Sequence, residues 1–351
     1  MNNSLSELSY PLASNRPAAG QALDVADGLR WLRMALPFAL DHINLWLLRD
    51  HFDGRDGWTL VDTCIDTPQS RQAWEDVFQN HLEGLPIVRI VITHMHPDHI
   101  GLAHWLCERW QAPMWISMGD YLNARLGSGA VRGFGGEAAR RFFAQHGISD
   151  PQDLHAVGLH GPRYGDMVPQ VPSQYRRLLN GQEVHIGKRN WRCIVGYGHA
   201  PEHMALYDEA GGLLISGDMV LPRISTNVSV YEADPEGDPL GLFLNSIQGF
   251  MGLPLETRVL PSHGDPFIGL HTRVAQLQQH HAERLQELTE ACRDKAQSAL
   301  DILPVLFKRQ LDSHQLAFAM GEAIAHLNHL WHQKRLNRQR DAHGVWRFQA
   351  V

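Results

Sequence analysis

The chain has few of the features that mark a secreted, membrane-spanning or disulfide-stabilised protein. It has only four cysteines in 351 residues, far apart and with no Cys-x-x-Cys pair: Cys64, Cys107, Cys193 and Cys292. Reduced, mostly buried thiols are therefore expected instead of a disulfide framework. No run of about 18 apolar residues occurs, and residues 1–20 lack a basic segment followed by an apolar core. We expect neither a membrane span nor a secretory signal, and hence a cytoplasmic protein.

An excess of basic charge and several common catalytic motifs are also missing. The net charge of −7 argues against a protein that binds nucleic acid over a broad surface. No Gly-x-Ser-x-Gly elbow and no glycine-rich loop ending in Lys-Ser/Thr is present, which excludes those hydrolase and phosphate-binding signatures. The apolar content of 44% and charged content of 20% are typical of a soluble globular chain, and its length favours two structural units.

The most informative stretch is Thr93-His94-Met95-His96-Pro97-Asp98-His99, which directly follows the apolar run at residues 87–92. Such a β-branched run predicts a buried strand, so the polar residues lie at its C-terminal end, where α/β proteins place active sites. Imidazole and carboxylate are ligands that zinc and similar divalent ions take. With 22 histidines some crowding is expected, but the ordered His-x-His-x-Asp-His motif favours a metal site over a histidine-rich surface loop.

Three further motifs follow in order: Gly198-His199-Ala200-Pro201-Glu202-His203, Ser216-Gly217-Asp218 and Pro261-Ser262-His263-Gly264-Asp265. With the first motif they resemble the metallo-β-lactamase superfamily over about residues 25–270. The resemblance implies an α/β fold, the αββα sandwich of two mixed sheets, and a site for two divalent ions. By this analogy seven residues are ligands: His94, His96 and His199 for one metal, Asp98, His99 and His263 for the second, and Asp218 as the bridge.

The resemblance also suggests residues that support the ligands. Asp62-Thr63-Cys64 matches the family's Asp-Thr-Gly turn, with Cys64 in place of the glycine. Asp62 would then orient a ligand histidine, a supporting contact that metal sites usually require. His203, four residues after His199, is the second candidate for such a role.

The expected chemistry is hydrolysis. Two divalent ions roughly 3.5–4 Å apart can share a hydroxide, because a metal lowers the pKa of its bound water to about 7. Asp98 would be the catalytic residue, binding a metal and accepting a hydrogen bond from the nucleophile. Zinc is the metal we expect first, and the sequence leaves iron and manganese open.

The bridging Asp218 narrows the choice of substrate. True β-lactamases resemble this layout but lack that aspartate, so the chain looks like the glyoxalase II, lactonase and phosphodiesterase branches. An ester or thioester of the acyl-CoA or glutathione type is our first expectation. The alternatives are a phosphodiesterase or endoribonuclease, a lactonase, and a metal-containing, non-catalytic ligand sensor.

Three parts are predicted along the chain: a flexible N-terminal arm (1–24), the catalytic domain (25–270) and a C-terminal domain (271–351). Within the catalytic domain, the glycine-rich residues 119–180 form a cap insertion with helical pieces near 137–146 and 173–180. This insertion is rich in arginine, which fits either a solvated helical surface or the attraction of an anionic small-molecule substrate. Arg140 and Arg141 are the candidate substrate contacts.

The C-terminal domain has a different pattern. Helical spacing of apolar residues predicts three helices, followed by a small hairpin around the turn Asp341-Ala342-His343-Gly344. This order resembles the winged-helix-like unit of some glyoxalase II-like hydrolases. Residues 275–351 hold ten Lys and Arg against eight Asp and Glu, a balance of only +2. Packing or homodimerisation is therefore favoured over nucleic-acid contact, which stays the alternative.

Overall fold

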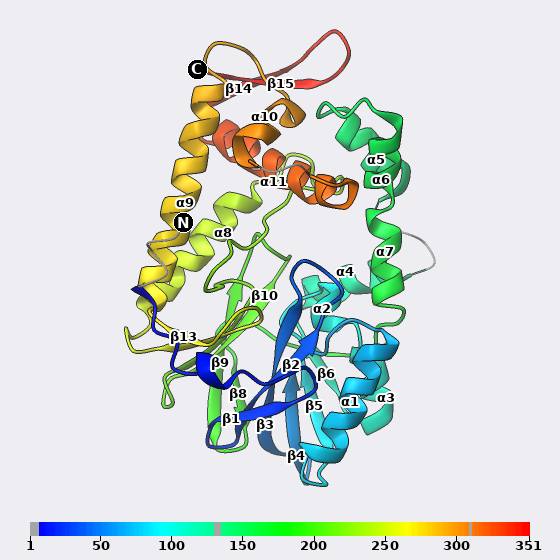
Figure 1. Cartoon of the computed structure of the whole chain (residues 1–351), viewed down its shortest axis with the longest axis vertical. Coiled ribbons are helices and arrows are strands. Elements are labelled where there is room, and N and C mark those ends of the chain that lie inside the picture. The colour runs from blue at the N-terminus through cyan, green and yellow to red at the C-terminus, as the bar shows by residue number, and fades with distance from the viewer. Residues whose placement is uncertain (1–6, 130–134, 309–310) are drawn as a thin grey trace.

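Two stacked β-sheets, with helices on their outer faces, form the body of the protein (Figure 1). The structure is a computed structural model that describes residues 7–129, 135–308 and 311–351. The predicted αββα architecture is confirmed. No helix in these ranges is long and apolar enough to cross a membrane.

The first sheet has seven strands, which lie side by side in sequence order. They are β1 (Ala22–Ala26), β2 (Leu29–Ala35), β3 (His42–Phe52), β4 (Arg55–Val61), β5 (Ile87–Val91), β6 (Met114–Ile116) and β7 (Arg176–Arg177). The strands β1 to β4 form an antiparallel meander, and β4 to β7 run parallel. Asp53 and Gly54 join β3 to β4 with positive φ angles of 55° and 74°, the backbone of a two-residue hairpin turn.

The second sheet has six strands in the order β13-β12-β11-β10-β9-β8. They are β8 (Glu183–Ile186), β9 (Arg189–Gly196), β10 (His203–Asp208), β11 (Leu213–Gly217), β12 (Arg258–Pro261) and β13 (Phe267–Ile268). The pair β11–β12 is parallel and the other pairs are antiparallel, so both sheets are mixed.

Side chains that alternate along the strands divide the core into layers. Trp31 and Trp46 of the first sheet pack between the sheets in one cluster with Trp191 of the second. On the outer face of the first sheet, Leu32 and Leu60 pack in the same cluster as Trp74 of a covering helix.

Eleven α-helices lie within the described residues. They are α1 (Pro68–Asn80), α2 (Pro97–Ile100), α3 (Ala103–Trp110), α4 (Met118–Ser128), α5 (Gly136–Ala144), α6 (Pro151–Gly158), α7 (His160–Met167), α8 (Pro239–Gly249), α9 (Leu270–Ala291), α10 (Ala299–Leu306) and α11 (Ser313–His332). Side-chain caps fix several starts: the Thr67 hydroxyl accepts the Ser70 N–H before α1, and Ser298 and Asp301 form a capping box for α10.

The cap insertion contains α4 to α7, but its predicted helix at 173–180 is wrong. Arg176 and Arg177 instead form β7, which pairs with Trp115 and Ile116 at the edge of the first sheet. This segment forms a strand because it pairs with the free edge of β6. That pairing outweighs the helical spacing of its apolar residues.

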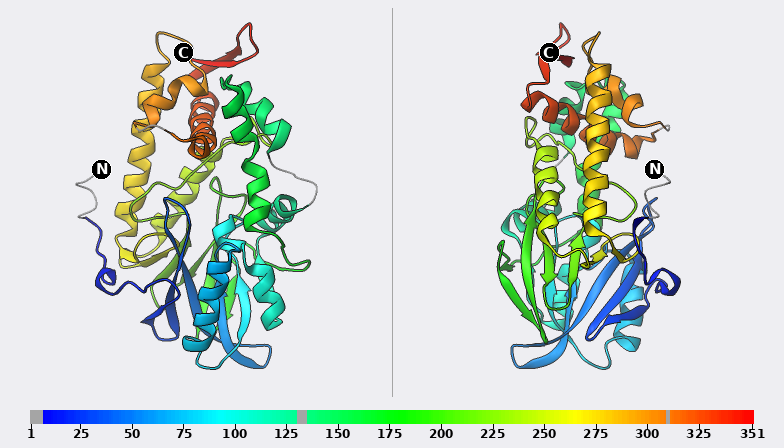
Figure 2. Two further views of the ribbon diagram at one scale, coloured as in Figure 1. Left: turned by 45° about the vertical axis from the view of Figure 1, so that its right-hand side comes forward. Right: turned by 90° about the vertical axis from the view of Figure 1, so that its left-hand side faces the viewer.

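The C-terminal domain and the cap share a hydrophobic core. Phe143 of α5, Val157 of α6, Ile302 of α10 and Ile324 of α11 belong to one buried cluster, which continues to the outer face of the second sheet. The long helix α9 runs from that sheet toward the C-terminal end (Figure 2). The three predicted helices are followed by the predicted hairpin, β14 (Leu336–Arg340) and β15 (Trp346–Ala350). The winged-helix resemblance stays a prediction.

The N-terminal segment differs from the predicted flexible arm over its described part. Leu8 is buried, and Ser9 pairs with Ile268 at the edge of the second sheet. The Arg16 guanidinium donates to the carboxylate of Asp265, with Nη2 2.6 Å from Oδ2. These contacts attach residues 7–24 to the sandwich because the segment supplies an edge partner to β13.

Candidate metal centre

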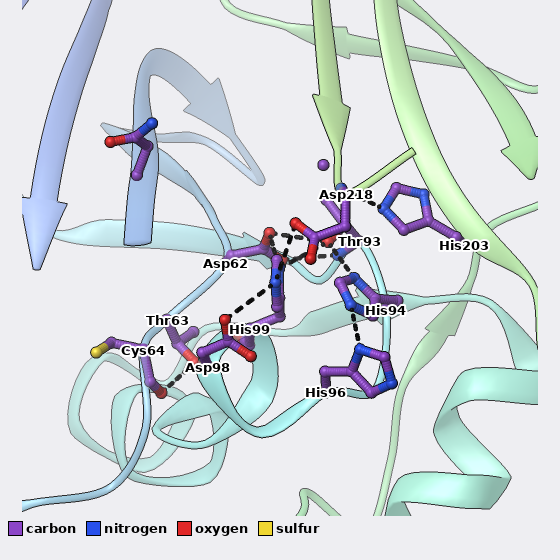
Figure 3. A network of polar contacts seen from close by, with 12 residues as sticks. Asp62, Thr63, Cys64, Thr93, His94, His96, Asp98, His99, His203 and Asp218 are labelled. Atoms are coloured by element: carbon purple, nitrogen blue, oxygen red, sulfur yellow. Dashed lines mark hydrogen bonds and ion pairs between the residues drawn. The ribbon is translucent and has the colours of Figure 1, made fainter. Parts of the chain in front are cut away.

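All seven predicted ligands lie at one end of the two sheets, where strands end and loops begin. Figure 3 shows five of them, His94, His96, Asp98, His99 and Asp218. His94 and His96 lie between β5 and the short helix α2, and Asp98 and His99 lie within α2. His199, Asp218 and His263 follow β9, β11 and β12 in that order. Pro97 stands at the first position of α2, which turns the chain directly after His96 and brings Asp98 and His99 back toward the strand ends.

The first cluster contains three histidines. Nε2 of His94 lies 2.9 Å from Nδ1 of His96 and 3.2 Å from Nε2 of His199. These ring nitrogens all lie within 4.8 Å of one another, close enough to share one ion. His94 also belongs to a group with His99 and Asp218, whose ligand atoms lie within the same distance of one another.

The second cluster contains Asp98, His99 and His263, also with ligand atoms within 4.8 Å. Oδ2 of Asp98 lies 3.3 Å from Nε2 of His263 and 3.5 Å from Nε2 of His99. The Asp218 carboxylate spans the two clusters. Its Oδ2 lies 3.4 Å from Nε2 of His199, while its Oδ1 lies 3.5 Å from Nε2 of both His99 and His263.

The donor atoms fit a pair of divalent ions. Nε2 of His99, Nε2 of His263 and Oδ1 of Asp218 are buried, and none has a hydrogen-bond partner within the described residues. Leaving a buried polar atom unpaired costs about 1–3 kcal/mol, so three such atoms converging on one point need a common partner. Imidazole nitrogen and carboxylate oxygen are suitable ligands for zinc, and a divalent cation would satisfy all three.

Asp62 contacts the second cluster through the ring of His99. Its Oδ2 accepts a hydrogen bond from Nδ1 of His99 at 2.8 Å, which leaves Nε2 of that ring free for a metal. Its Oδ1 accepts the Thr93 N–H at 2.8 Å, and its Oδ2 also accepts the Thr93 hydroxyl proton at 2.8 Å. The carboxylate thus fixes both the ring and the loop that carries His94.

Backbone carbonyls orient two further ligands. Nδ1 of His199 lies 2.7 Å from the carbonyl oxygen of Asn227, and Nδ1 of His263 lies 2.7 Å from that of His42. A carbonyl only accepts, so both Nδ1 atoms carry the proton and both Nε2 atoms face the centre. His203 is not in either ligand cluster. Its Nε2 accepts the Asp218 N–H at 3.0 Å and so helps to hold Asp218 in place.

The electrostatics of the second cluster favour a cation. Burial lowers the pKa of His99, but the carboxylates of Asp98, Asp62 and Asp218 outweigh burial and raise that pKa to about 9. Burial raises the pKa of Asp98, but His99 and His263 outweigh it and lower that pKa to about 2. Positive charge is therefore stabilised at the point where the second metal would lie, and metal binding would displace the protons.

Cys64 adopts the backbone conformation that the family's glycine would supply. Its φ is 75° and that of Asp62 is 62°, so the turn has two residues in the left-handed region. The thiol is buried, and burial raises its pKa to about 12, which makes Cys64 a structural residue and a poor nucleophile.

Arg140 and Arg141 are not brought to the ligands. They lie on α5, whose buried side chains Ala139, Phe142 and Phe143 pack with the C-terminal helices, away from α2 (Figure 1). The Arg140 guanidinium is bound to Glu137 of the same helix, with Nη2 3.0 Å from Oε2.

Several supporting residues were not found from the sequence. Thr93 stands at the start of the first motif, but its supporting role was not predicted, and Asn227 belongs to no motif. A hydroxyl and a backbone carbonyl become part of the site only through tertiary contact. The Asn227 side chain also donates a hydrogen bond to the Glu322 carboxylate of α11, and the Val230 N–H donates to the Gly321 carbonyl at 3.1 Å. The C-terminal domain therefore contacts the loop that orients His199.

The αββα sandwich and its paired clusters of imidazole and carboxylate define the class of metallo-hydrolases. The chain belongs to the metallo-β-lactamase superfamily, whose model matches residues 39–263, and a model described as the metallo-β-lactamase-like C-terminal domain matches residues 285–351. This membership makes the chain a hydrolase that depends on bound metal.

Among its relatives is "Probable metallo-hydrolase YqjP" of Bacillus subtilis, 23% identical over 303 residues that cover 85% of this chain and 90% of that protein. The chain is similar in structure to a β-lactamase domain protein from Burkholderia ambifaria, with 50% identity, a TM-score of 0.94 and complete coverage of both chains. A metallo-β-lactamase family protein from Thermus thermophilus matches with a TM-score of 0.79 and 26% identity, over 93% of this chain and all of that one. The match thus extends through the cap and the C-terminal domain.

Proposed function

We propose that this protein hydrolyses an ester or thioester of a small molecule, of the acyl-CoA or glutathione-thioester type, with two zinc ions. The observation that carries the proposal is the position of Asp218, whose two oxygens face different ligand clusters. A shared carboxylate is the feature by which the sequence resembles the glyoxalase II, lactonase and phosphodiesterase branches and departs from true β-lactamases.

When bound, the ions would supply a hydroxide at neutral pH and polarise the substrate carbonyl. His94, His96 and His199 would hold one ion, and Asp98, His99 and His263 the other, with Asp218 between them. Asp98 has the most exposed side chain of the ligands in the second cluster, at 19%. It therefore faces the open side of the centre, where it can accept a hydrogen bond from the attacking oxygen.

A substrate panel tests the proposal. Metal-replete protein is given acyl-CoA and glutathione thioesters, simple esters, lactones and RNA, and released thiol, acid or cleaved strand is measured. Thioester or ester turnover that disappears in Asp98→Ala supports the proposal. Cleavage of RNA alone would favour the phosphodiesterase alternative, lactone opening alone would favour the lactonase alternative, and tight ligand binding without turnover would favour a sensor. Reconstitution with zinc, iron or manganese identifies the active metal.

The charge of the substrate is a further part of the proposal. An anionic substrate would be attracted by the arginines of the cap, of which Arg141 is exposed on α5. The double variant Arg140→Ala, Arg141→Ala should then raise KM and weaken the salt dependence of kcat/KM. An unchanged salt slope would show that these arginines are a solvated surface.

We also propose a cytoplasmic location and a homodimer as the assembly to look for. All four cysteines are free and buried, which fits a reducing compartment. Light scattering of the purified chain at several concentrations tests the dimer, and a salt-dependent shift with RNA tests nucleic-acid contact.

A further inference from the structure

The peptide group between two metal-ligand histidines is held by the cap insertion. Met95 separates His94 from His96, and its N–H donates to Oδ1 of Asp120 at 2.8 Å. The carbonyl of Met95 accepts a hydrogen bond from the Tyr164 hydroxyl at 2.6 Å. Asp120 lies in α4 and Tyr164 in α7, so two cap helices fix both polar groups of this one residue.

The other oxygen of Asp120 reaches the loop of the third ligand. Its Oδ2 accepts the N–H of Glu202 at 2.8 Å and the hydroxyl proton of Ser117 at 3.0 Å. Glu202 stands three residues after His199, and its own Oε2 accepts the N–H of Gly119 at 2.8 Å. Reciprocal hydrogen bonds therefore join the start of α4 to the loop of His199.

A purely structural role for Asp120 as a helix cap does not explain these contacts. The Ser117 hydroxyl already accepts the Asp120 N–H at 3.3 Å, so the start of α4 has its cap. The Asp120 side chain is fully buried, and burial raises its pKa to about 6 in spite of the hydrogen bonds that favour the charged form. Burying a carboxylate is costly unless it is fully hydrogen-bonded, and here the donors come from both ligand-bearing loops.

We propose that Asp120, assisted by Tyr164, is a positioning residue for the metal site formed by His94, His96 and His199, and that the cap insertion thereby sets the geometry of that site. The inference rests on the proposed metal centre. The second site depends on different supports, since Asp62 and the carbonyl of His42 orient His99 and His263 from outside the insertion. Replacing Asp120 should thus lower the metal affinity of the site formed by His94, His96 and His199 and leave the affinity of the other site unchanged.

Metal titration of the full chain tests this. The protein is stripped with a chelator and titrated with Co²⁺, with calorimetry for affinity and absorption spectra for the ligand environment. We expect Asp120→Ala to weaken one of the two binding events about 10- to 100-fold, the range found when supporting residues of metal sites are removed. The other event should keep the wild-type affinity. Asp62→Asn should weaken the opposite event most, because Asp62 accepts directly from the His99 ring and reaches the His94 loop only through Thr93, and this identifies each site.

Two further variants distinguish a local effect on the metal site from a general loss of folding. Tyr164→Phe removes only the hydroxyl that binds the Met95 carbonyl, and we expect a weaker effect on the same site. Asp166→Asn changes an exposed acid on the same helix, two residues from Tyr164, and should leave both affinities unchanged. Equal weakening of both sites, or unchanged binding in Asp120→Ala and Tyr164→Phe, would overturn the inference. Because the readout is metal binding, a failure of the proposed esterase activity would leave the result interpretable.

Discussion

Oδ2 of Asp62 lies 2.8 Å from Nδ1 of His99, and both side chains are buried. The contact fixes the protonated nitrogen of the imidazole on the side away from the second cluster. It also connects the turn after β4 to the helix after β5, two neighbouring parallel strands of the first sheet. The orientation of one ligand therefore depends on a residue that binds no metal itself.

Replacement of Asp62 by asparagine should weaken the second metal. Asparagine has one acceptor oxygen, so it cannot serve His99 Nδ1, the Thr93 N–H and the Thr93 hydroxyl together. We expect a loss of about 10- to 100-fold in affinity for that ion or in activity. Metal content after dialysis, measured by elemental analysis, checks it. Asp66→Asn is the matched control, because Asp66 binds Arg71 on the same stretch of chain.

Asp218→Ala should abolish the paired site. The two cations would lose the carboxylate that faces both clusters, and their mutual repulsion would be uncompensated. We expect about two ions per chain in the wild type by elemental analysis, no more than one in the variant, and near-complete loss of hydrolysis. Glu209→Gln, an exposed acid at the opposite end of the β10–β11 hairpin, should keep both ions. Retention of two ions in Asp218→Ala would contradict the bridging role.

The buried pair of Arg89 and Asp50 should contribute to the stability of the sandwich. Nη2 of Arg89 lies 2.6 Å from Oδ2 of Asp50 and 2.7 Å from the His185 carbonyl, and Oδ1 of Asp50 accepts the Gly187 N–H. These bonds connect the first sheet to the edge of the second. Arg89→Met leaves a buried carboxylate without its cation, which should cost about 3–5 kcal/mol.

Urea unfolding measures this cost. The exposed Arg55 at the tip of the β3–β4 hairpin supplies the control, since Arg55→Ala should change the free energy of unfolding by less than about 0.5 kcal/mol. The metal content of folded Arg89→Met should be normal, because the hydrogen bonds of the pair go to Thr59, His185 and Gly187, none of which is a predicted ligand. A stability equal to that of the wild type would show that the pair contributes nothing.

Acid should destabilise the interface between α9 and α11. Nδ1 of His281 lies 3.2 Å from Nε2 of His326, whose Nδ1 donates to the Glu322 carbonyl. This network requires two neutral rings. Burial, with the neighbouring His326, His280 and His329, lowers the pKa of His281 to about 2. Burial also lowers the pKa of His326 to about 4, with further lowering by His280, His329 and Arg284.

Proton linkage gives the direction in which the free energy of unfolding changes with pH. In the unfolded chain these histidines have a pKa of about 6.5, so they bind protons below that pH. In the folded protein the same rings stay neutral until a lower pH. The free energy of unfolding should therefore fall as the pH drops from about 6.5 toward 4. Each ring adds a slope of at most about 1.4 kcal/mol per pH unit. His281→Gln keeps a donor for His326 and should flatten the slope, measured by thermal unfolding of metal-loaded protein. His155→Gln, an exposed histidine of α6, should not.

Local sequence determined a large part of this protein. The apolar run before His94 and Pro97 after His96 fix a strand, a turn and the order of four candidate ligands within a few residues, because strand and helix starts depend on near neighbours. The ordered motifs then implied the sandwich and the grouping of all seven ligands. The helices of the C-terminal domain followed from periodic apolar positions for the same reason.

Contacts between distant segments decided the rest. The strand at Arg176 forms because β6 offers an unpaired edge, and the N-terminal segment is attached because Ser9 finds the edge at Ile268. The predicted ligands are also supported by a hydroxyl, a carbonyl, a buried carboxylate and a phenol, from Thr93, Asn227, Asp120 and Tyr164. No motif indicated these supporting roles. Such hydrogen bonds form only when residues that are distant in sequence come close together. The packing of the cap and the C-terminal helices onto the two sheets brings these residues together.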